Sequence, residues 1–159
     1  MPILITTIES NHMEDTFLIS QQFIKKNDDQ PTFLYILNPN NHSGKVGDRS
    51  KEIELTLQNY KKRIQETLKI DNFHAKIRIG KPEEEIVNET HQYPYDLIIF
   101  DDPVRKQRNL GFKRTIAQRI IEKVPCSVLI VRGKSQQFRK ILLCDSGAEE
   151  SRLMEKYLS

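Results

Sequence analysis

The fold is decided by residues 96–131, which read "DLIIFDDPVRKQRNLGFKRTIAQRIIEKVPCSVLIV". The runs "DLIIF" and "SVLIV" are short and apolar, as is typical of strands buried in a parallel sheet. Between them, Phe112, Ile116, Ile120 and Val124 recur at helical spacing. A strand, a helix and a second strand in this order predict a βαβ unit.

The same alternation of strands and helices extends toward the N-terminus. Strands are predicted at residues 2–8, 32–37 and 73–79. Helices are predicted after Ser10 or Asn11, from about residue 49 to 69, and from Pro82 onward. In residues 73–79, apolar and polar side chains alternate strictly, which favours a strand at a sheet edge with one face in water. The whole order predicts an α/β fold with a mostly parallel sheet covered by helices on both faces.

Composition excludes several classes of protein. The 159 residues fit one domain with an appendage, and the net charge of +3, from 25 basic and 22 acidic residues, is too small to indicate nucleic-acid binding. No apolar run approaches the roughly 18 residues of a membrane span, and the N-terminus has no signal-like stretch. We therefore expect no membrane insertion and a cytoplasmic protein.

The sequence shows no clear pattern of catalytic or metal-binding residues. Cys126 and Cys144 form no CxxC pattern and are expected to be reduced and buried. The histidines show no zinc-like spacing; they are His12, His42, His74 and His91. No Ser-His-Asp arrangement can be assigned, so we do not expect an enzyme.

Residues 78–133 resemble the C-terminal half of a universal stress protein domain. The similarity is carried, in order, by "GKPEEEI", "DLIIF" and "AQRIIEKVPCSVLIVR", and needs no gap from Asp96 to Arg132. It extends more weakly over the whole of residues 1–133. The resemblance implies a doubly wound open sheet of five parallel strands, of the adenine nucleotide alpha hydrolase-like kind. Its ligands would sit where the strand order reverses.

The C-terminal residues divide into a linker and a further segment. Residues 134–138 are polar, and residues 139–159, "RKILLCDSGAEESRLMEKYLS", begin with a new apolar run. This segment is similar to the first strand and helix of a second copy, as in tandem members of the family. A lone β-α pair cannot build its own core, so we expect it to pack on its own domain or on another chain.

The resemblance also implies a nucleotide site. ATP-binding members carry G-x2-G-x9-G followed by Ser or Thr, because glycines let backbone N–H groups approach the phosphates. The corresponding site positions in this chain are Thr7, Ile8, Leu37, Asp101, Val104, Arg114 and Thr115. Asp101, Val104 and Arg114 replace the three glycines, Ile8 replaces the family's adenine-contacting aspartate, and Thr115 keeps the pattern. A carboxylate at the first position repels a polyanion, so we predict no ATP binding in the family manner and no cofactor.

Two other interpretations of the loop at residues 101–115 stay open. Its basic side chains could hold ATP or AMP without the glycines, or could form a solvated surface; they are Arg105, Lys106, Arg108, Lys113 and Arg114. No aromatic residues are interleaved with them, so nucleic acid is not an expected partner. Asp101 and Asp102, with Glu9, could bind Mg²⁺, or could cap the loop and pair with Arg105.

The final strand implies a mode of assembly. In the family, the strand that matches residues 126–131 lies at the sheet edge and pairs with its counterpart in a second domain. The resemblance therefore implies a homodimer, or a tandem pseudo-dimer, through residues 126–131. The function expected is that of a regulatory interaction module in a stress response, with an unknown protein partner. The alternative is a regulatory domain that binds ATP or AMP.

Overall fold

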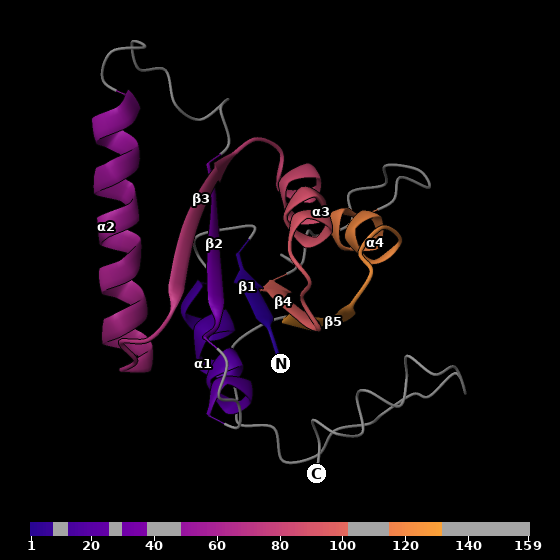
Figure 1. Ribbon diagram of the computed structural model, residues 1–159, viewed down its shortest axis with the longest axis horizontal. Helices are drawn as coiled ribbons and strands as arrows, with labels where there is room; N and C mark the ends of the chain where they lie inside the picture. The colour runs from indigo at the N-terminus through magenta and orange to yellow at the C-terminus, as the bar shows by residue number, and fades with distance from the viewer. Residues whose placement is uncertain (8–12, 26–29, 38–48, 102–114, 132–159) are drawn as a thin grey trace, which may run out of the picture.

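The computed structural model describes residues 1–7, 13–25, 30–37, 49–101 and 115–131. Its strands are β1 (Ile3–Thr6), β2 (Thr32–Leu37), β3 (His74–Ile79), β4 (Leu97–Asp101) and β5 (Ser127–Val131). Its helices are α1 (Met13–Ile24), α2 (Arg49–Leu68), α3 (Pro82–Gln92) and α4 (Ile116–Ile121). The predicted alternation of strands and helices is confirmed (Figure 1). None of the helices in these ranges is long and apolar enough to cross a membrane.

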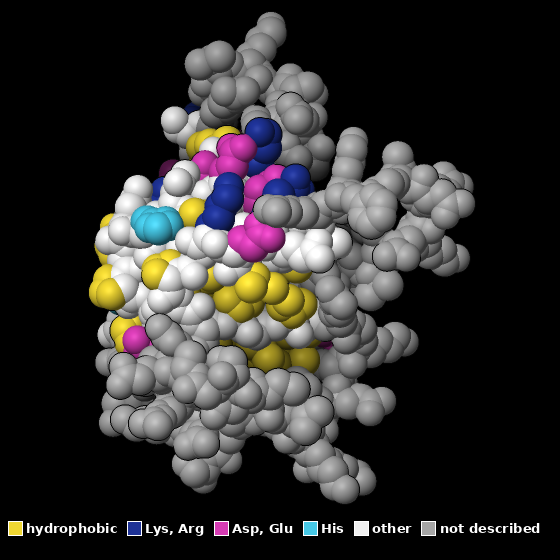
Figure 2. Space-filling model, turned by 90° about the vertical axis from the view of Figure 1, so that its right-hand side faces the viewer, with side chains coloured by type: hydrophobic (Ala, Val, Ile, Leu, Met, Phe, Trp, Pro, Cys, Tyr) yellow, Lys and Arg dark blue, Asp and Glu magenta, His cyan; other side chains and the backbone are white. Residues whose placement is uncertain are grey.

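The strands form one parallel sheet in the order β3-β2-β1-β4-β5. This is the doubly wound arrangement of five strands that the sequence predicts. β1 lies in the centre and pairs with β2 on one side and β4 on the other, so the strand order reverses between β1 and β4. β3 and β5 form the two edges. Figure 2 faces the side that carries α4 and β5, where hydrophobic side chains gather in the middle of the surface.

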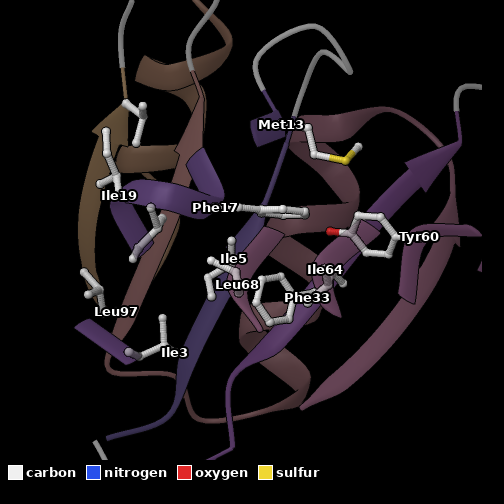
Figure 3. Close-up of a cluster of buried hydrophobic side chains, with 12 residues drawn as sticks. Ile3, Ile5, Met13, Phe17, Ile19, Phe33, Tyr60, Ile64, Leu68 and Leu97 are labelled. Carbon is white, nitrogen blue, oxygen red and sulfur yellow. The ribbon is translucent and has the colours of Figure 1, made fainter. Parts of the chain in front are cut away.

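The sheet is buried between two layers of helices. On one face, α1 and α2 pack on the strands, and Phe17, Phe33 and Tyr60 meet at the centre of the core (Figure 3). The rings of Phe17 and Phe33 are perpendicular, with centroids 5.3 Å apart. On the other face, Ile86 of α3 and Ile120 of α4 join a second apolar cluster. Because both layers cover it, every residue of β4 is buried, as its apolar run predicts.

The fourth helix is shorter than its apolar spacing predicts. α4 begins at Ile116, directly after Thr115, and ends at Ile121. Val124 continues the stripe on the same apolar cluster but lies beyond the last helical residue. Phe112, the first member of the predicted stripe, is outside the described residues. Spacing alone therefore overestimated the helix, because the polar cap at Thr115 fixes its start.

The edge strand β3 differs from its prediction in one respect. Its place at a sheet edge is confirmed, but its polar face is only partly open to water: His74 is exposed, whereas Lys76 and Arg78 are half-buried. Lys76 and Arg78 point toward α3, where the side chain of Glu89 is completely buried and pairs with both cations. The alternation of residues 73–79 therefore predicted the edge strand correctly, and it predicted the solvated face correctly at His74 but not at Lys76 and Arg78, which turn toward Glu89.

Candidate functional site

Two polar residues meet where the strand order reverses. The register pairs Thr6 of β1 with Phe100 of β4, so the next residues, Thr7 and Asp101, lie side by side at the carboxyl ends. Strand alternation places both on the face that carries α1 and α2, beyond Ile5 and Ile99. Both are buried, and Asp101 is only 1% exposed. The structure thus brings together two of the residues that the sequence predicted for the site.

The hydroxyl of Tyr60 belongs to the same region of the molecule. Tyr60 comes from α2, is buried on the same face of the sheet, and donates to the carbonyl oxygen of Leu34 at 3.5 Å. Burial raises the pKa of this phenol above its ordinary value, and the nearby Tyr35 and Asp101 add to the effect. In the sequence, Tyr60 is one of the apolar residues that recur at helical spacing between about residues 49 and 69. This spacing does not indicate where the hydroxyl group of the ring points.

A second hydroxyl at the end of β1 was not anticipated. The Oγ1 atom of Thr6 is buried and has no hydrogen-bond partner among the described residues, and strand alternation turns it to the face opposite Thr7. A buried polar group without a partner costs about 1–3 kcal/mol, so such atoms are uncommon in folded proteins. Thr6 and Thr7 together present one hydroxyl to each face of the sheet at its carboxyl edge.

The other predicted positions are more scattered. Leu37 is the last residue of β2 and is buried. It lies three residues beyond Leu34, which pairs with Thr6, and is therefore about 10 Å farther along the strand direction than Thr6. Thr115 is the N-cap of α4: its Oγ1 accepts from the backbone N–H of Gln118 at 3.1 Å, and the Gln118 side chain accepts from Thr115 N at 2.8 Å. The exposed hydroxyl of Thr115 is thus already used in a capping box. Ile8, Val104 and Arg114 lie outside the described residues.

The described residues do not assemble a metal or thiol centre. Within the ranges given above, no three His, Cys, Asp or Glu side chains gather in a way that could hold a metal ion. Glu9, Asp102 and Arg105, which the magnesium and loop-cap readings require, are outside these ranges. Cys126 is a free, half-buried thiol whose pKa is raised to about 11, chiefly by burial and also by the charge of Asp96. Such a thiol is a poor nucleophile at neutral pH.

The strongest charged cluster lies away from the strand ends, between α3 and β3. Glu89 Oε1 accepts from Lys76 Nζ at 2.8 Å and from the Tyr95 hydroxyl at 2.8 Å, and Glu89 Oε2 accepts from Arg78 Nε at 2.7 Å. Lys76 also stands 3.5 Å above the ring of Tyr93. Every strong acceptor position of the carboxylate is occupied, so this cluster clamps α3 to the sheet edge and leaves no place for a ligand.

A shallow groove of about 300 Å³ runs between α3 and α4. Its lining residues are Glu83, Glu84, Val87, Asn88, Arg119 and Lys123. Three of the four charged side chains that line it are already engaged: Glu83 pairs with Arg119 at 3.3 Å, and Glu84 pairs with Lys81 at 2.8 Å. The groove is therefore a salt-bridged helix interface. The three glutamates at the start of α3 form ion pairs with neighbouring cations and also interact favourably with the helix dipole.

Comparison with known proteins supports the architecture. The model of the universal stress protein family matches residues 1–132. The universal stress protein UspA from Lactobacillus plantarum is 15% identical and covers 83% of this chain and 97% of its own, with a TM-score of 0.59. A universal stress protein in complex with cAMP is 13% identical, with the same coverage and TM-score. The universal stress protein from Archaeoglobus fulgidus in complex with dAMP is 15% identical over 83% of this chain and 98% of its own, at 0.53. No curated protein matches the chain significantly.

Proposed function

The chain belongs to the universal stress protein family, and we propose that it acts as a dimerising interaction module whose ATP-binding motif is degraded. In this proposal it works in a cytoplasmic stress response, catalyses no reaction, and recognises another protein. The observation that carries the proposal is the contrast between the two edges of the sheet. The residues at the carboxyl ends of β1 and β4 support the other part of the proposal, the loss of ATP binding.

The edge at β5 has the composition of an association surface. Its sequence, "SVLIV", contains no charge, and four of its five residues are only half-buried. Near it, Ile121 of α4 is 48% exposed, and Val124 and Cys126 are partly buried hydrophobic residues of the same apolar cluster as Val128 and Ile130. The opposite edge, β3, carries Lys76 and Arg78 within its strand, and charges in an edge strand oppose pairing with another strand. Pairing through β5 is therefore favoured over pairing through β3.

The carboxyl ends of β1 and β4 suit a phosphate poorly. Asp101 is part of β4, pairs in register with Val131, and is almost completely buried beside Thr7. A buried carboxylate raises the cost of bringing a polyanion close, because little water screens the repulsion. Thr115, the residue that keeps the family pattern, already uses its hydroxyl to cap α4. These features support the loss of ATP binding in the family manner.

A nucleotide-binding regulatory domain is the second candidate. Two structures of this fold are described as complexes with cAMP and with dAMP, so the fold itself accommodates adenine nucleotides. The exposed Thr115 and the basic residues of the loop 105–115 would then hold the phosphate by side chains.

Ligand retention and calorimetry distinguish the two candidates. Freshly purified protein is denatured and filtered, and the filtrate is examined for adenine; the chain has no Trp and five Tyr, so its own absorbance is low. ATP and AMP are then titrated to millimolar concentration. We expect no nucleotide and no binding heat. Stoichiometric nucleotide, or a saturable heat that Arg114→Gln abolishes, would establish the second candidate instead.

The dimer is tested separately by light scattering. Ser127 N donates to Asp96 O at 3.1 Å, so the N–H groups of Val128 and Ile130, which alternate with it, point away from β4. Ile130→Pro removes one outward donor and leaves the ladder to β4 in place, whereas Ile130→Val keeps the donor and serves as the control. Any self-association through this edge should weaken in Ile130→Pro and persist in Ile130→Val. Equal association in both would exclude the β5 edge.

A further inference from the structure

The backbone of β5 presents its outward hydrogen-bonding groups at alternate residues. Ser127 N donates to Asp96 O at 3.1 Å, so Ser127 and every second residue after it turn their backbone groups toward β4. The N–H and C=O groups of Val128 and Ile130 therefore turn away from the sheet. All residues of the strand are uncharged, and no described strand lies beyond it. The positions of the outward groups restrict how a second copy can pair with this edge.

Symmetry and this alternation together select the direction of pairing. A closed dimer of identical chains has a two-fold axis. If the two β5 strands ran parallel, the axis would set Val128 opposite Val128 of the partner subunit, with the groups of both pointing at each other. A parallel ladder is built differently: Ser127 points toward β4, is in register with Leu97, and bonds to the neighbouring Asp96. A two-fold dimer through this edge is therefore antiparallel.

The same groups select the register. In an antiparallel ladder, residues that point toward each other exchange two N–H···O bonds. An axis through Leu129 sets Val128 opposite the partner's Ile130 and Ile130 opposite the partner's Val128, so both outward residues of each copy are bonded. An axis through Val128 or Ile130 pairs only part of the strand. An axis between two residues sets outward groups opposite inward ones and forms no ladder.

This inference rests on the proposed dimer through the β5 edge. We propose that the two-fold axis of that dimer crosses β5 at Leu129, with the two strands antiparallel. Leu129 lies on the α1 face, half-buried against the first apolar cluster, and at the axis it meets the partner's Leu129. On the α4 face, the half-buried Val128 stands beside the partner's Ile130. The register thus brings apolar side chains together on both faces of the sheet and sets no charge against another.

The register fixes the distances between equivalent residues of the two copies. Leu129 and the partner's Leu129 form a pair without hydrogen bonds, and the Cα atoms of such a pair lie about 4.5 Å apart, within the range that a disulfide spans. Val128 is displaced from the partner's Val128 by two residues, about 7 Å along the strand, and by about 4.8 Å between the strands. The resulting Cα separation of about 8 Å exceeds the disulfide limit of about 7 Å, and the same holds for Ile130.

Disulfide crosslinking of the full-length chain tests these distances. Cys126→Ser and Cys144→Ser first remove the chain's own thiols. Val128→Cys, Leu129→Cys and Ile130→Cys are then introduced singly, and each folded protein is oxidised at micromolar concentration. We expect Leu129→Cys to run as a covalent dimer of twice the 18.7 kDa chain, and each of the other two to stay a single chain. Co-expression of Val128→Cys with Ile130→Cys should restore the crosslink, because the Cα atoms of that pair lie about 5.5 Å apart.

Light scattering on the cysteine-free protein separates the register from the dimer itself. A monomer would overturn the proposed dimer and the register with it. A dimer in which Val128→Cys or Ile130→Cys crosslinks alone, while Leu129→Cys does not, would overturn the register and preserve the proposed dimer. A dimer in which no variant and no co-expressed pair crosslinks would overturn the β5 edge as the contact. If Leu129→Cys fails to fold, the co-expressed pair decides between these outcomes.

Discussion

The clamp at Glu89 gives the sharpest test of how the sheet edge is held. Replacement of Glu89 by Gln keeps the volume and removes the charge that faces Lys76 and Arg78. Removal of one partner from a buried ion pair costs about 3–5 kcal/mol, because the other charge stays uncompensated. Here the side chains of Lys76 and Arg78 are 33% and 22% exposed and can turn partly toward water, so we expect about 2–3 kcal/mol.

Urea unfolding at neutral pH measures this loss directly. With a slope of roughly 2 kcal/mol per molar urea, the midpoint of Glu89→Gln should fall by about 1 M or slightly more. Glu66→Gln is the matched control, because Glu66 pairs with Lys62 at 3.8 Å on an exposed helix surface. That pair should contribute less than about 0.5 kcal/mol. A loss at Glu89 as small as the loss at Glu66 would show that the buried cluster contributes no net stability.

The dependence of this effect on pH has a definite sign. Burial alone raises the pKa of Glu89, but hydrogen bonds from Lys76, Arg78 and Tyr95 together lower it below its ordinary value. A carboxyl with a lowered folded-state pKa stabilises the protein fully above its unfolded value, near about 4.3, and less as the pH falls below it. The difference between the wild type and Glu89→Gln should be constant from about pH 5 to 7 and should narrow in acid. A difference that widens in acid would contradict the assignment.

Three further predictions concern the helix cap at Thr115, the thiol of Cys126 and the core residue Phe17. Thr115→Ala should lower the free energy of unfolding by about 1 kcal/mol, since the capping box of α4 is lost, whereas Thr115→Ser should retain most of it in urea titrations. In a Cys144→Ser background, the Cys126 thiol should react with a disulfide reagent at pH 8 much more slowly in the folded protein than in urea, because its pKa is raised to about 11; equal rates would contradict its burial. Phe17→Ala should destabilise the protein by about 3–5 kcal/mol, since Phe17 is completely buried against Phe33 and Tyr60; a loss below about 1 kcal/mol would show that the core collapses around the gap.

The elements of the fold could be predicted because each has a local cause. The apolar runs of β1, β2 and β4 are mostly buried on both faces, and burial on both faces produces the continuous pattern that identifies a parallel strand. β5 has the same kind of apolar run, although four of its five residues are only half-buried. The edge position of β3 followed from its alternation. The extent of α4 could not be predicted from its stripe, since Val124 packs on the same core without being helical.

The candidate site was less accessible from sequence. Asp101 and Thr7 were assigned to the site through the family resemblance, and the apolar runs placed them near the strand ends. Tyr60 and Thr6 were missed, since the direction of a hydroxyl depends on which helix or strand faces it in space. Glu89 was missed for the same reason: "PEEEIVNETHQ" contains four glutamates, and only the packing of α3 on β3 selects the fourth for burial.

The two edges of the sheet together limit the size of any assembly. A parallel sheet with two open apolar edges could add copies on both sides, and such addition does not close. In this chain the β3 edge holds Lys76 and Arg78, and Glu89 fixes both cations in place. The clamp is therefore a protection against edge-to-edge growth as well as a source of stability. In the dimer proposed above, with one edge guarded in this way, pairing through β5 would satisfy one neighbour, a second copy of the protein, and assembly through this sheet would stop at a closed pair.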